Sequence, residues 1–248
     1  MPDALRLAIG TLTRLPVPAP RQVDRRTAGI AMSLSPLVAL VLGVVCGLPL
    51  LISPDRPLLA LVLSICAFGL LAWATRALHL DGLADTADAL GSGKPAEEAL
   101  AIARKSDIGP FGVITLLFAL LLDVTAVASM PEARDAYLAF VLAVVISRVA
   151  LTLACTRAWP AARPEGLGYV VAGSVPAVIA LAWTAIGLAL AWWLLGATAV
   201  LSASLGLVAA LVLLLITRRR LGGITGDVLG ATIELTTTAT LLALTLLV

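Results

Sequence analysis

The sequence predicts an all-α fold, a polytopic bundle of membrane-spanning helices that forms a single membrane domain over residues 1–248. Of the 248 residues, 60% are hydrophobic and 13% are charged, whereas a soluble domain is about half apolar and about a quarter charged. The apolar residues fall in runs of about 20, the length that a helix needs to cross the hydrocarbon layer. The runs lack the alternation of membrane β-strands, which favours helices over a barrel.

The N-terminal segment, residues 1–28, is predicted to lie in the cytoplasm or at the membrane surface. Residues 3–15 are predicted to form a short amphipathic helix at the interface. Arg6 and Arg14 interrupt the apolar stretch, and prolines close it at residues 16–20, which is not typical of a signal peptide.

About seven membrane spans follow. They are expected at about residues 29–52, 57–78, 111–130, 136–158, 172–195, 197–217 and 228–247. In the first span Pro36 is expected to kink the helix, because proline lacks a backbone N–H. Gly43 and Gly47 form a GxxxG pattern there, which is typical of a close contact between helices.

Basic residues gather on one side of this arrangement. That side receives Arg6, Arg14, Arg21, Arg25, Arg26, Arg76, Lys94, Arg104, Lys105, Arg157, Arg163, Arg218, Arg219 and Arg220. The opposite side keeps only Arg56 and Arg134. Because positive charge marks the cytoplasmic side, the N-terminus is predicted inside and the C-terminus outside. We therefore expect a multi-pass protein of a bacterial-type inner (cytoplasmic) membrane, in contact with the lipid bilayer and not with nucleic acid, whose active site faces the cytoplasm.

The cytoplasmic side receives an acidic loop at residues 79–110, which begins with HLDGLADTADAL (79–90). Asp81, Asp85 and Asp88 are spaced i, i+4 and i+7, so they share one face of a predicted helix, where Gly82 leaves room for a substrate. Like charges on one stripe repel each other, and a bound cation would relieve the repulsion. Mg²⁺, or alternatively Mn²⁺, suits oxygen ligands and is usually held by one or two carboxylates plus substrate phosphates. The three aspartates are candidate metal ligands for a diphosphate substrate; the alternative is a solvated helix cap.

Other cytoplasmic residues are candidates for phosphate contacts. The turn GGITGD, with Gly222, Gly223 and Asp227, precedes the last helix and could present backbone N–H groups to an anion. For Asp227 a helix cap is the equal alternative. Arg163 is either a phosphate ligand or a positive-inside anchor. His79, the one histidine of the chain, is a phosphate contact, a proton-transfer group or a hydrogen-bonded interfacial residue.

Charged residues also fall inside predicted spans, namely Asp123, Arg148 and Glu234. Ionisable groups inside a membrane are functional candidates by default. Arg148 is expected either to line the active cavity and contact the substrate, or to form a structural ion pair with Asp123 on the neighbouring span. The roles of Asp123 and Glu234 are left open.

Together these stretches resemble the cobalamin (5′-phosphate) synthase family, the adenosylcobinamide-GDP ribazoletransferases. HLDGLADTADAL is similar to the hallmark of that family. LTRLPVP (12–18), SDIGPFGV (106–113), ARPEGLG (162–168) and GGITGDVLGATIEL (222–235) occur in the family's order. The chain reads KSD at residues 105–107, where many members carry DSR, so no family role carries over to Asp107.

The resemblance implies the last step in the assembly of the nucleotide loop of cobalamin. Adenosylcobinamide-GDP would transfer its adenosylcobinamide-phosphate moiety to α-ribazole or α-ribazole 5′-phosphate, giving adenosylcobalamin or its 5′-phosphate and releasing GMP. Mg²⁺ is the expected cofactor, with Asp81, Asp85 and Asp88 as catalytic metal ligands. Asp88 is the candidate base, and Arg148, Arg163 and the turn 222–227 would contact phosphate.

Other classes of protein remain as alternatives. A membrane phosphotransferase of the CDP-alcohol type would need a DGxxAR motif, where this chain reads DGLADT, and a UbiA-like prenyltransferase would need a second Asp-rich loop. A small-solute transporter would use the charges inside the spans as an ion path, but the paired interrupted helices of repeat-built transporters are not visible. The sequence leaves a homo-oligomer open.

Overall fold

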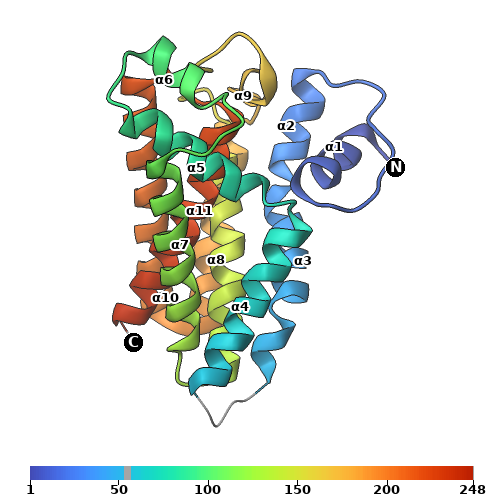
Figure 1. The fold of residues 1–248 in the computed structure, drawn as a ribbon. Helices are drawn as coiled ribbons and strands as arrows, with labels where there is room; N and C mark the ends of the chain where they lie inside the picture. Colours follow the sequence, from blue (N-terminus) through green and yellow to red (C-terminus); the bar gives the residue numbers. More distant parts are fainter. Residues whose placement is uncertain (53–56, 248) are drawn as a thin grey trace.

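The structure, a computed structural model, describes residues 1–52 and 57–247 and confirms the predicted all-α fold (Figure 1). The helices are α1 (Asp3–Leu12), α2 (Arg25–Ser33), α3 (Ser35–Cys46), the 3₁₀ turn η1 (Leu48–Leu51), α4 (Pro57–Ala74), α5 (Leu78–Gly91), α6 (Ala96–Ile102), α7 (Pro110–Ala128), α8 (Ala133–Ala154), α9 (Gly166–Val171), α10 (Ala177–Arg220) and α11 (Gly226–Leu247). No strand forms within these described ranges. Arg56, which was predicted on the outer side, lies outside the described residues.

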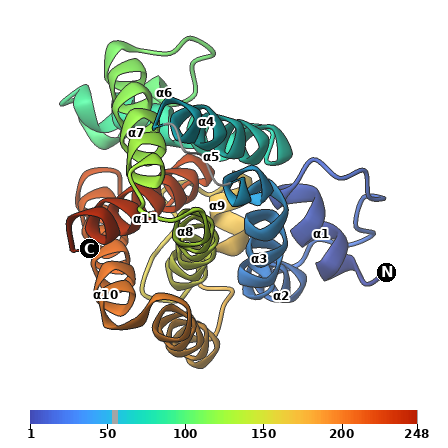
Figure 2. The ribbon, with the colours of Figure 1, turned by 90° about the horizontal axis from the view of Figure 1, so that it is seen from below.

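Among the described residues, 6 stretches of helix are long and apolar enough to cross a membrane: Arg25–Cys46, which joins α2 to α3, and α4, α7, α8, α10 and α11. Helix α10 spans 44 residues but bends at Gly196, whose φ of 77° and ψ of −157° are non-helical. Figure 2 shows the parts before and after the bend as two separate rods. If the two parts of α10 are counted separately, the long helices follow the order of the predicted spans along the chain. The number of membrane crossings and the side of the N-terminus stay predictions.

The first span contains the expected interruption at Pro36. Helix α2 ends at Ser33, and α3 begins at Ser35 with Pro36 in its first turn. Proline has no N–H to donate to the carbonyl of the residue four positions earlier, here Met32. The hydroxyl of Ser35 donates to this carbonyl instead, at 2.7 Å, so the buried acceptor keeps a hydrogen bond across the kink.

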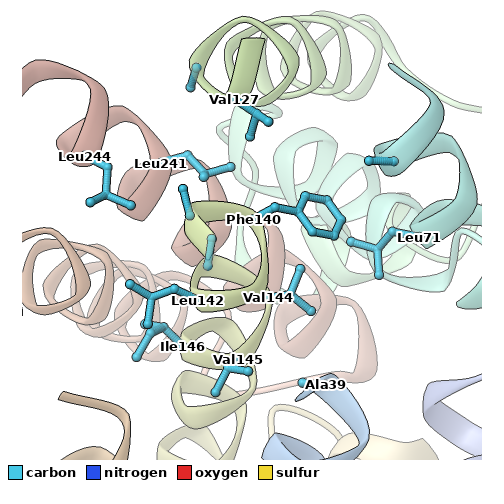
Figure 3. Close-up of a cluster of buried hydrophobic side chains, with 14 of the residues drawn as sticks. Ala39, Leu71, Val127, Phe140, Leu142, Val144, Val145, Ile146, Leu241 and Leu244 are labelled. Carbon is cyan, nitrogen blue, oxygen red and sulfur yellow. The ribbon is translucent and has the colours of Figure 1, made fainter. Parts of the chain in front are cut away.

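Helix α8 lies at the centre of the bundle, with the other spans around it (Figure 2). Its side chains Phe140, Leu142, Val144 and Ile146 are completely buried (Figure 3). The ring of Phe140 also meets the ring of Phe68 from α4 edge to face, with centroids 5.0 Å apart. Side chains on all sides of α8 are therefore removed from lipid, which makes it the scaffold of the fold.

The predicted GxxxG pattern in α3 packs against this central helix. A Cβ atom at Gly43 would lie 3.2 Å from the Cα atom of Val141, and one at Gly47 would lie 3.2 Å from the ring of Phe140. Such distances leave no space for a side chain, so the two glycines allow the backbones to approach. The predicted close helix contact is confirmed.

The short amphipathic helix predicted near the N-terminus is also present, as α1. Its buried face consists of Ala4, Ala8 and Leu12. Helix α1 lies beside α2, outside the ring of long helices (Figure 1). Its position relative to a membrane surface stays a prediction.

The chain turns after the second span, and the acidic stretch forms the separate helix α5. Arg76 and Ala77 adopt left-handed backbone conformations, with φ of 58° and 53°, and these turn the chain after α4. Neither residue is a glycine, so the sequence carries no local signal for this break. Helix α5 then runs across one end of the bundle, the end that also carries α6 and α9 (Figure 1).

Replacing Gly43 with leucine should destabilise the protein, because the new side chain would separate α3 from α8. Overpacking of this kind costs about 1–3 kcal/mol, which corresponds to a melting temperature lowered by at least about 2 °C in a protein of this size. Thermal unfolding in detergent measures the change. Gly69→Leu is the matched control, since nothing lies within 4 Å of a Cβ atom at Gly69. Equal melting temperatures for the two variants would contradict the close packing.

Candidate active site

Helix α5 touches the beginning of α11 backbone to backbone. A Cβ atom at Gly82 would lie 2.7 Å from the carbonyl oxygen of Asp227, and one at Gly230 would lie 3.1 Å from the carbonyl oxygen of His79. Only residues without a side chain fit at such distances. The space at Gly82 is thus filled by α11, and the expectation that Gly82 leaves room for a substrate is wrong.

This contact brings carboxylates from two distant parts of the sequence together. Asp85 is half-buried, and its pKa is raised to about 6, first by burial and then by the negative charges of Asp81, Asp227 and Asp88. Asp81 is exposed and shares with Asp227 a cavity of about 290 Å³. Three of the predicted site residues, Asp81, Asp85 and Asp227, therefore form one acidic cluster at the end of the bundle.

Asp88 has a different environment, although it lies on the same helix. Its Oδ2 accepts a hydrogen bond from the N–H of Gly109 at 2.7 Å, and its Oδ1 accepts one from the N–H of Gly112 at 2.9 Å. The side chain is 8% exposed and sits at the N-terminus of α7, where a carboxylate satisfies free N–H groups. Asp88 thus caps a helix, which agrees with the alternative to metal binding considered for the three aspartates. Its side chain is buried, however, and not solvated as that alternative expected.

The predicted ligation of one metal ion by three aspartates has no counterpart in the described residues. Within them, no group of three or more His, Cys, Asp or Glu side chains lies close enough to hold an ion. A spacing of i, i+4 and i+7 produces a row of carboxylates along a helix and not a cage. Mg²⁺ needs only one or two carboxylates together with phosphate oxygens. The acidic cluster therefore fits a Mg²⁺ ion whose remaining ligands come from a phosphate-bearing substrate.

Arg163 lines the cavity that Asp81 and Asp227 share, and its positive charge is opposite to the charge of the acidic cluster. Its Nη2 donates to the carbonyl of Leu100 at 2.5 Å, while its Nε is buried without a hydrogen-bond partner among the described residues. Burial and the nearby Arg104 lower the pKa of its guanidinium, and Asp227 opposes that shift. Arg163 therefore faces a cavity rather than acting only as an anchor at the surface.

The glycine-rich turn before α11 has a structural task that the sequence did not reveal. Gly222 and Gly223 have φ of 88° and 154°, and a side chain on Gly223 would overlap the carbonyl of Pro160. The N–H of Ile224 donates to that carbonyl at 2.8 Å, and Ile224 accepts a bond from Ala162 at 2.9 Å. The turn thus fastens the loop around Pro160 to α11, and at least the N–H of Ile224 is not free for an anion.

The residue that caps α11 is Thr225. Its hydroxyl oxygen accepts a hydrogen bond from the N–H of Val228 and donates to Oδ2 of Asp227, both at 3.2 Å. Of the two roles considered for Asp227, the capping role is therefore taken by its neighbour, and the carboxylate of Asp227 faces the cavity. A threonine directly before a helix is a recognised capping signal, so the sequence contained this information.

His79 and Arg148 lie behind the acidic cluster rather than in it. They are 4% and 2% exposed, and Nη2 of Arg148 lies 3.2 Å from Nδ1 of His79. Because arginine only donates, Nδ1 accepts and the imidazole is neutral; burial and then the charge of Arg148 hold the pKa of His79 well below its usual value. Glu234 lies 4.0 Å from the same ring nitrogen. This cluster ties α5 to α8 and α11. Of the alternatives for His79, the structure agrees with a hydrogen-bonded structural residue.

The ion pair with Asp123, one of the two alternatives for Arg148, does not form in the structure. It is absent from the ion pairs of the described residues, because Arg148 turns toward His79 and Ser147 instead. One carboxylate oxygen of Asp123 is buried without a hydrogen-bond partner in the same part of the chain. Asp107 is exposed and lines a further cavity of about 260 Å³ together with Asp85 and Asp88.

A bundle of long apolar helices with a polar site at one end defines a multi-pass membrane protein. A family model described as cobalamin-5-phosphate synthase matches residues 4–245, so the chain belongs to the cobalamin-5-phosphate synthase family, which confirms the resemblance found in the sequence. The chain is therefore a transferase of cobalamin biosynthesis, and the transporter alternative loses its support.

Curated relatives agree over almost the whole chain. An adenosylcobinamide-GDP ribazoletransferase of a Nocardioides species is 43% identical over 243 residues, covering 98% of each chain. The protein of the same name from Frankia casuarinae is 41% identical over 259 residues, covering 96% of this chain and 93% of the relative. One from Stutzerimonas stutzeri is 39% identical over 248 residues, covering 98% and 97%. No solved structure matches the chain.

Replacing Asp88 with alanine should destabilise the protein even in the absence of metal. The N–H groups of Gly109 and Gly112 would lose their acceptor, and the loss of a helix cap costs about 0.5–2 kcal/mol. Thermal unfolding in detergent with EDTA should therefore show a lower melting temperature. Asp107→Ala removes an exposed carboxylate that lines the same cavity and should leave it unchanged. If both variants melt with the wild type, the capping role of Asp88 is wrong.

Proposed function

We propose that this chain is a Mg²⁺-dependent adenosylcobinamide-GDP ribazoletransferase. It transfers the adenosylcobinamide-phosphate moiety of adenosylcobinamide-GDP to α-ribazole or α-ribazole 5′-phosphate and releases GMP. The names of the relatives support this activity. The observation that carries the proposal is the meeting of Asp81, Asp85 and Asp227 beside Arg163 at one end of the bundle.

The reaction exchanges one phosphorus–oxygen bond for another. A hydroxyl oxygen of the ribazole forms a bond to the phosphorus that carries the cobinamide, and the bond from this phosphorus to the bridging oxygen of the diphosphate breaks. The bridging oxygen keeps the electron pair and leaves with GMP, while the hydroxyl proton passes to a base. Such a transfer requires positioning and neutralisation of charge rather than a nucleophilic side chain.

The side chains that could ligate a metal in this cavity fit Mg²⁺, because all of them offer carboxylate oxygen atoms. Asp81 and Asp227 would supply the one or two protein carboxylates that Mg²⁺ usually takes, and the diphosphate would supply further ligands. When bound, Mg²⁺ neutralises charge on the oxygens of the diphosphate. The raised pKa of Asp85 supports this assignment, since it reflects burial and repulsion among carboxylates that a cation would relieve.

The side chains divide the remaining tasks. Arg163, which lines the cavity, would donate from its guanidinium to the diphosphate and orient it. Asp85 is the base in this proposal, because it has no hydrogen bond or ion pair within the described residues and lies one turn from Asp81. Asp88, the base suggested by the sequence, is less suited, since both of its oxygens already accept backbone N–H groups.

Replacing Asp85 with asparagine should lower the rate of GMP release by at least about 100-fold, the scale of a lost general base. The measurement uses purified protein with adenosylcobinamide-GDP, α-ribazole 5′-phosphate and titrated Mg²⁺. Glu97→Gln, a neutralisation of an exposed carboxylate on α6, is the control and should retain the wild-type rate. Near-normal turnover by Asp85→Asn would exclude this residue from the chemistry.

We further propose that the protein lies in the inner membrane with its active site and N-terminus in the cytoplasm. The basic residues support this orientation, because the active-site end carries Arg104, Lys105, Arg163 and the arginines at the end of α10. The described part of the opposite end carries Arg134, in the first turn of α8.

Single cysteines introduced into a variant without native cysteines should report this orientation. Glu132→Cys, between α7 and α8, should react with a membrane-impermeant maleimide applied to intact spheroplasts. Lys94→Cys, which follows α5, should react only after permeabilisation, because charged reagents do not cross the bilayer. Both positions are exposed in the structure, so accessibility alone does not separate them. The reverse labelling pattern would place the active site outside.

A further inference from the structure

A second cleft, of about 520 Å³, shares Arg163 with the acidic cavity. Its walls come from the start of α2, from the loop between α8 and α9, and from α9. Cavities of about 300–1,000 Å³ are typical of sites for small molecules and cofactors. The proposed transfer reaction assigns no ligand to this cleft, although Arg163 lines both the cleft and the acidic cavity.

Positive charge converges on the cleft. Besides Arg163, its lining includes Arg25 and Arg157, and none of its described lining residues is acidic. The Nη2 atom of Arg25 donates to the carbonyl of Ala172, and a Cβ atom at Gly173 would lie 3.2 Å from that Nη2 and 3.5 Å from Cγ of Arg157. Gly173, with φ of 67°, thus lets both arginines lie against one turn. Converging arginines in a concave site favour a phosphate group.

Aromatic side chains complete the lining. Tyr169 on α9 lines the cleft and is 54% exposed, while Trp159 is 8% exposed and forms part of the wall. A purine base can stack on such rings, and stacking contributes about 1–3 kcal/mol per base. Arginines together with the exposed ring of Tyr169 are the chemistry that recognises a nucleotide and not a phosphate alone.

The cleft is also held in a fixed position relative to the acidic cluster. Its wall at Pro160 and Ala162 is hydrogen-bonded to Ile224, three residues before Asp227. Arg163 lines both cavities, and its Nε is buried without a partner among the described residues. Arg163 therefore links the acidic cavity to the arginine–aromatic cleft.

We propose that this cleft binds the departing nucleoside monophosphate half of the diphosphate substrate, with Arg157 and Arg25 at its phosphate and Tyr169 and Trp159 at its base. The inference rests on the proposed function and adds the residues that hold the leaving group. Arginines suit the leaving half, because negative charge grows on its phosphate as the bond breaks. The acceptor must instead bring a hydroxyl group to a carboxylate, and the cleft contains none among its described residues.

The test measures binding of GMP and of α-ribazole 5′-phosphate to the full-length chain in detergent, by equilibrium dialysis. Arg157→Gln and Tyr169→Ala should each raise the Kd for GMP about tenfold, the scale of a lost charged hydrogen bond or stacking contact. The Kd for α-ribazole 5′-phosphate should stay within about twofold. Both side chains are exposed, so folding should be retained, which the melting temperature verifies. Arg219→Gln, an exposed arginine at the end of α10 that does not line the cleft, is the charge-matched control.

A spectroscopic signal adds an independent measurement. GMP should change the tryptophan fluorescence of the wild type, and Trp159→Phe should remove this change while GMP still binds. Unchanged GMP affinity in both cleft variants overturns the proposal, as does the absence of GMP binding by the wild type. Weakened binding of α-ribazole 5′-phosphate instead assigns the cleft to the acceptor. An equal loss in Arg219→Gln attributes binding to general surface charge.

Turnover in the same preparations separates this proposal from the one it rests on. If the wild type releases GMP from adenosylcobinamide-GDP but the cleft variants bind GMP normally, only the assignment of the cleft is wrong. If the wild type releases no GMP from adenosylcobinamide-GDP and α-ribazole 5′-phosphate with Mg²⁺ present, the proposed function is wrong.

Discussion

The backbone contact between α5 and the start of α11 is the constraint on which the rest of the site depends. Gly82 and Gly230 remove the side chains that would hold the two helices apart. At this distance the negative charge of Asp227 on α11 adds to burial and to the charge of Asp81 in raising the pKa of Asp85. Helix packing therefore imposes an electrostatic arrangement that a soluble, flexible loop would relax by moving its charges apart.

A buried layer beneath this contact stabilises it. The polar groups of His79, Arg148 and Glu234 meet where α5, α8 and α11 come together. A charge that is buried in an apolar bundle is destabilising unless partners surround it. The cluster thus supports the beginning of α5 from below, while the carboxylates of the same helix face the cavities above, and these opposite environments lie within a few residues of each other.

The sequence predicted most of the fold, because apolar runs of membrane length and local rules for proline and GxxxG depend on nearby residues only. It could not predict the break at Arg76, since a left-handed conformation without glycine is supported by distant contacts, such as the bond from Arg76 to the carbonyl of Gly10. In the site, helical spacing correctly grouped Asp81 with Asp85. Whether Asp88 met a substrate or a helix end depended on how α7 packs, which spacing does not encode.

Helix α5 is held at both ends, at its beginning by the bond between His79 and Arg148 and near its end by the bonds from Asp88 to α7. A helix attached in this way cannot swing aside as a gate. Under the proposed function, the bulky corrinoid half of the substrate would pass the loops that carry Lys105 and Pro164, both exposed. Helix α5 is thus fixed before a substrate binds. Room for a bulky substrate would have to come from movement of the connecting loops.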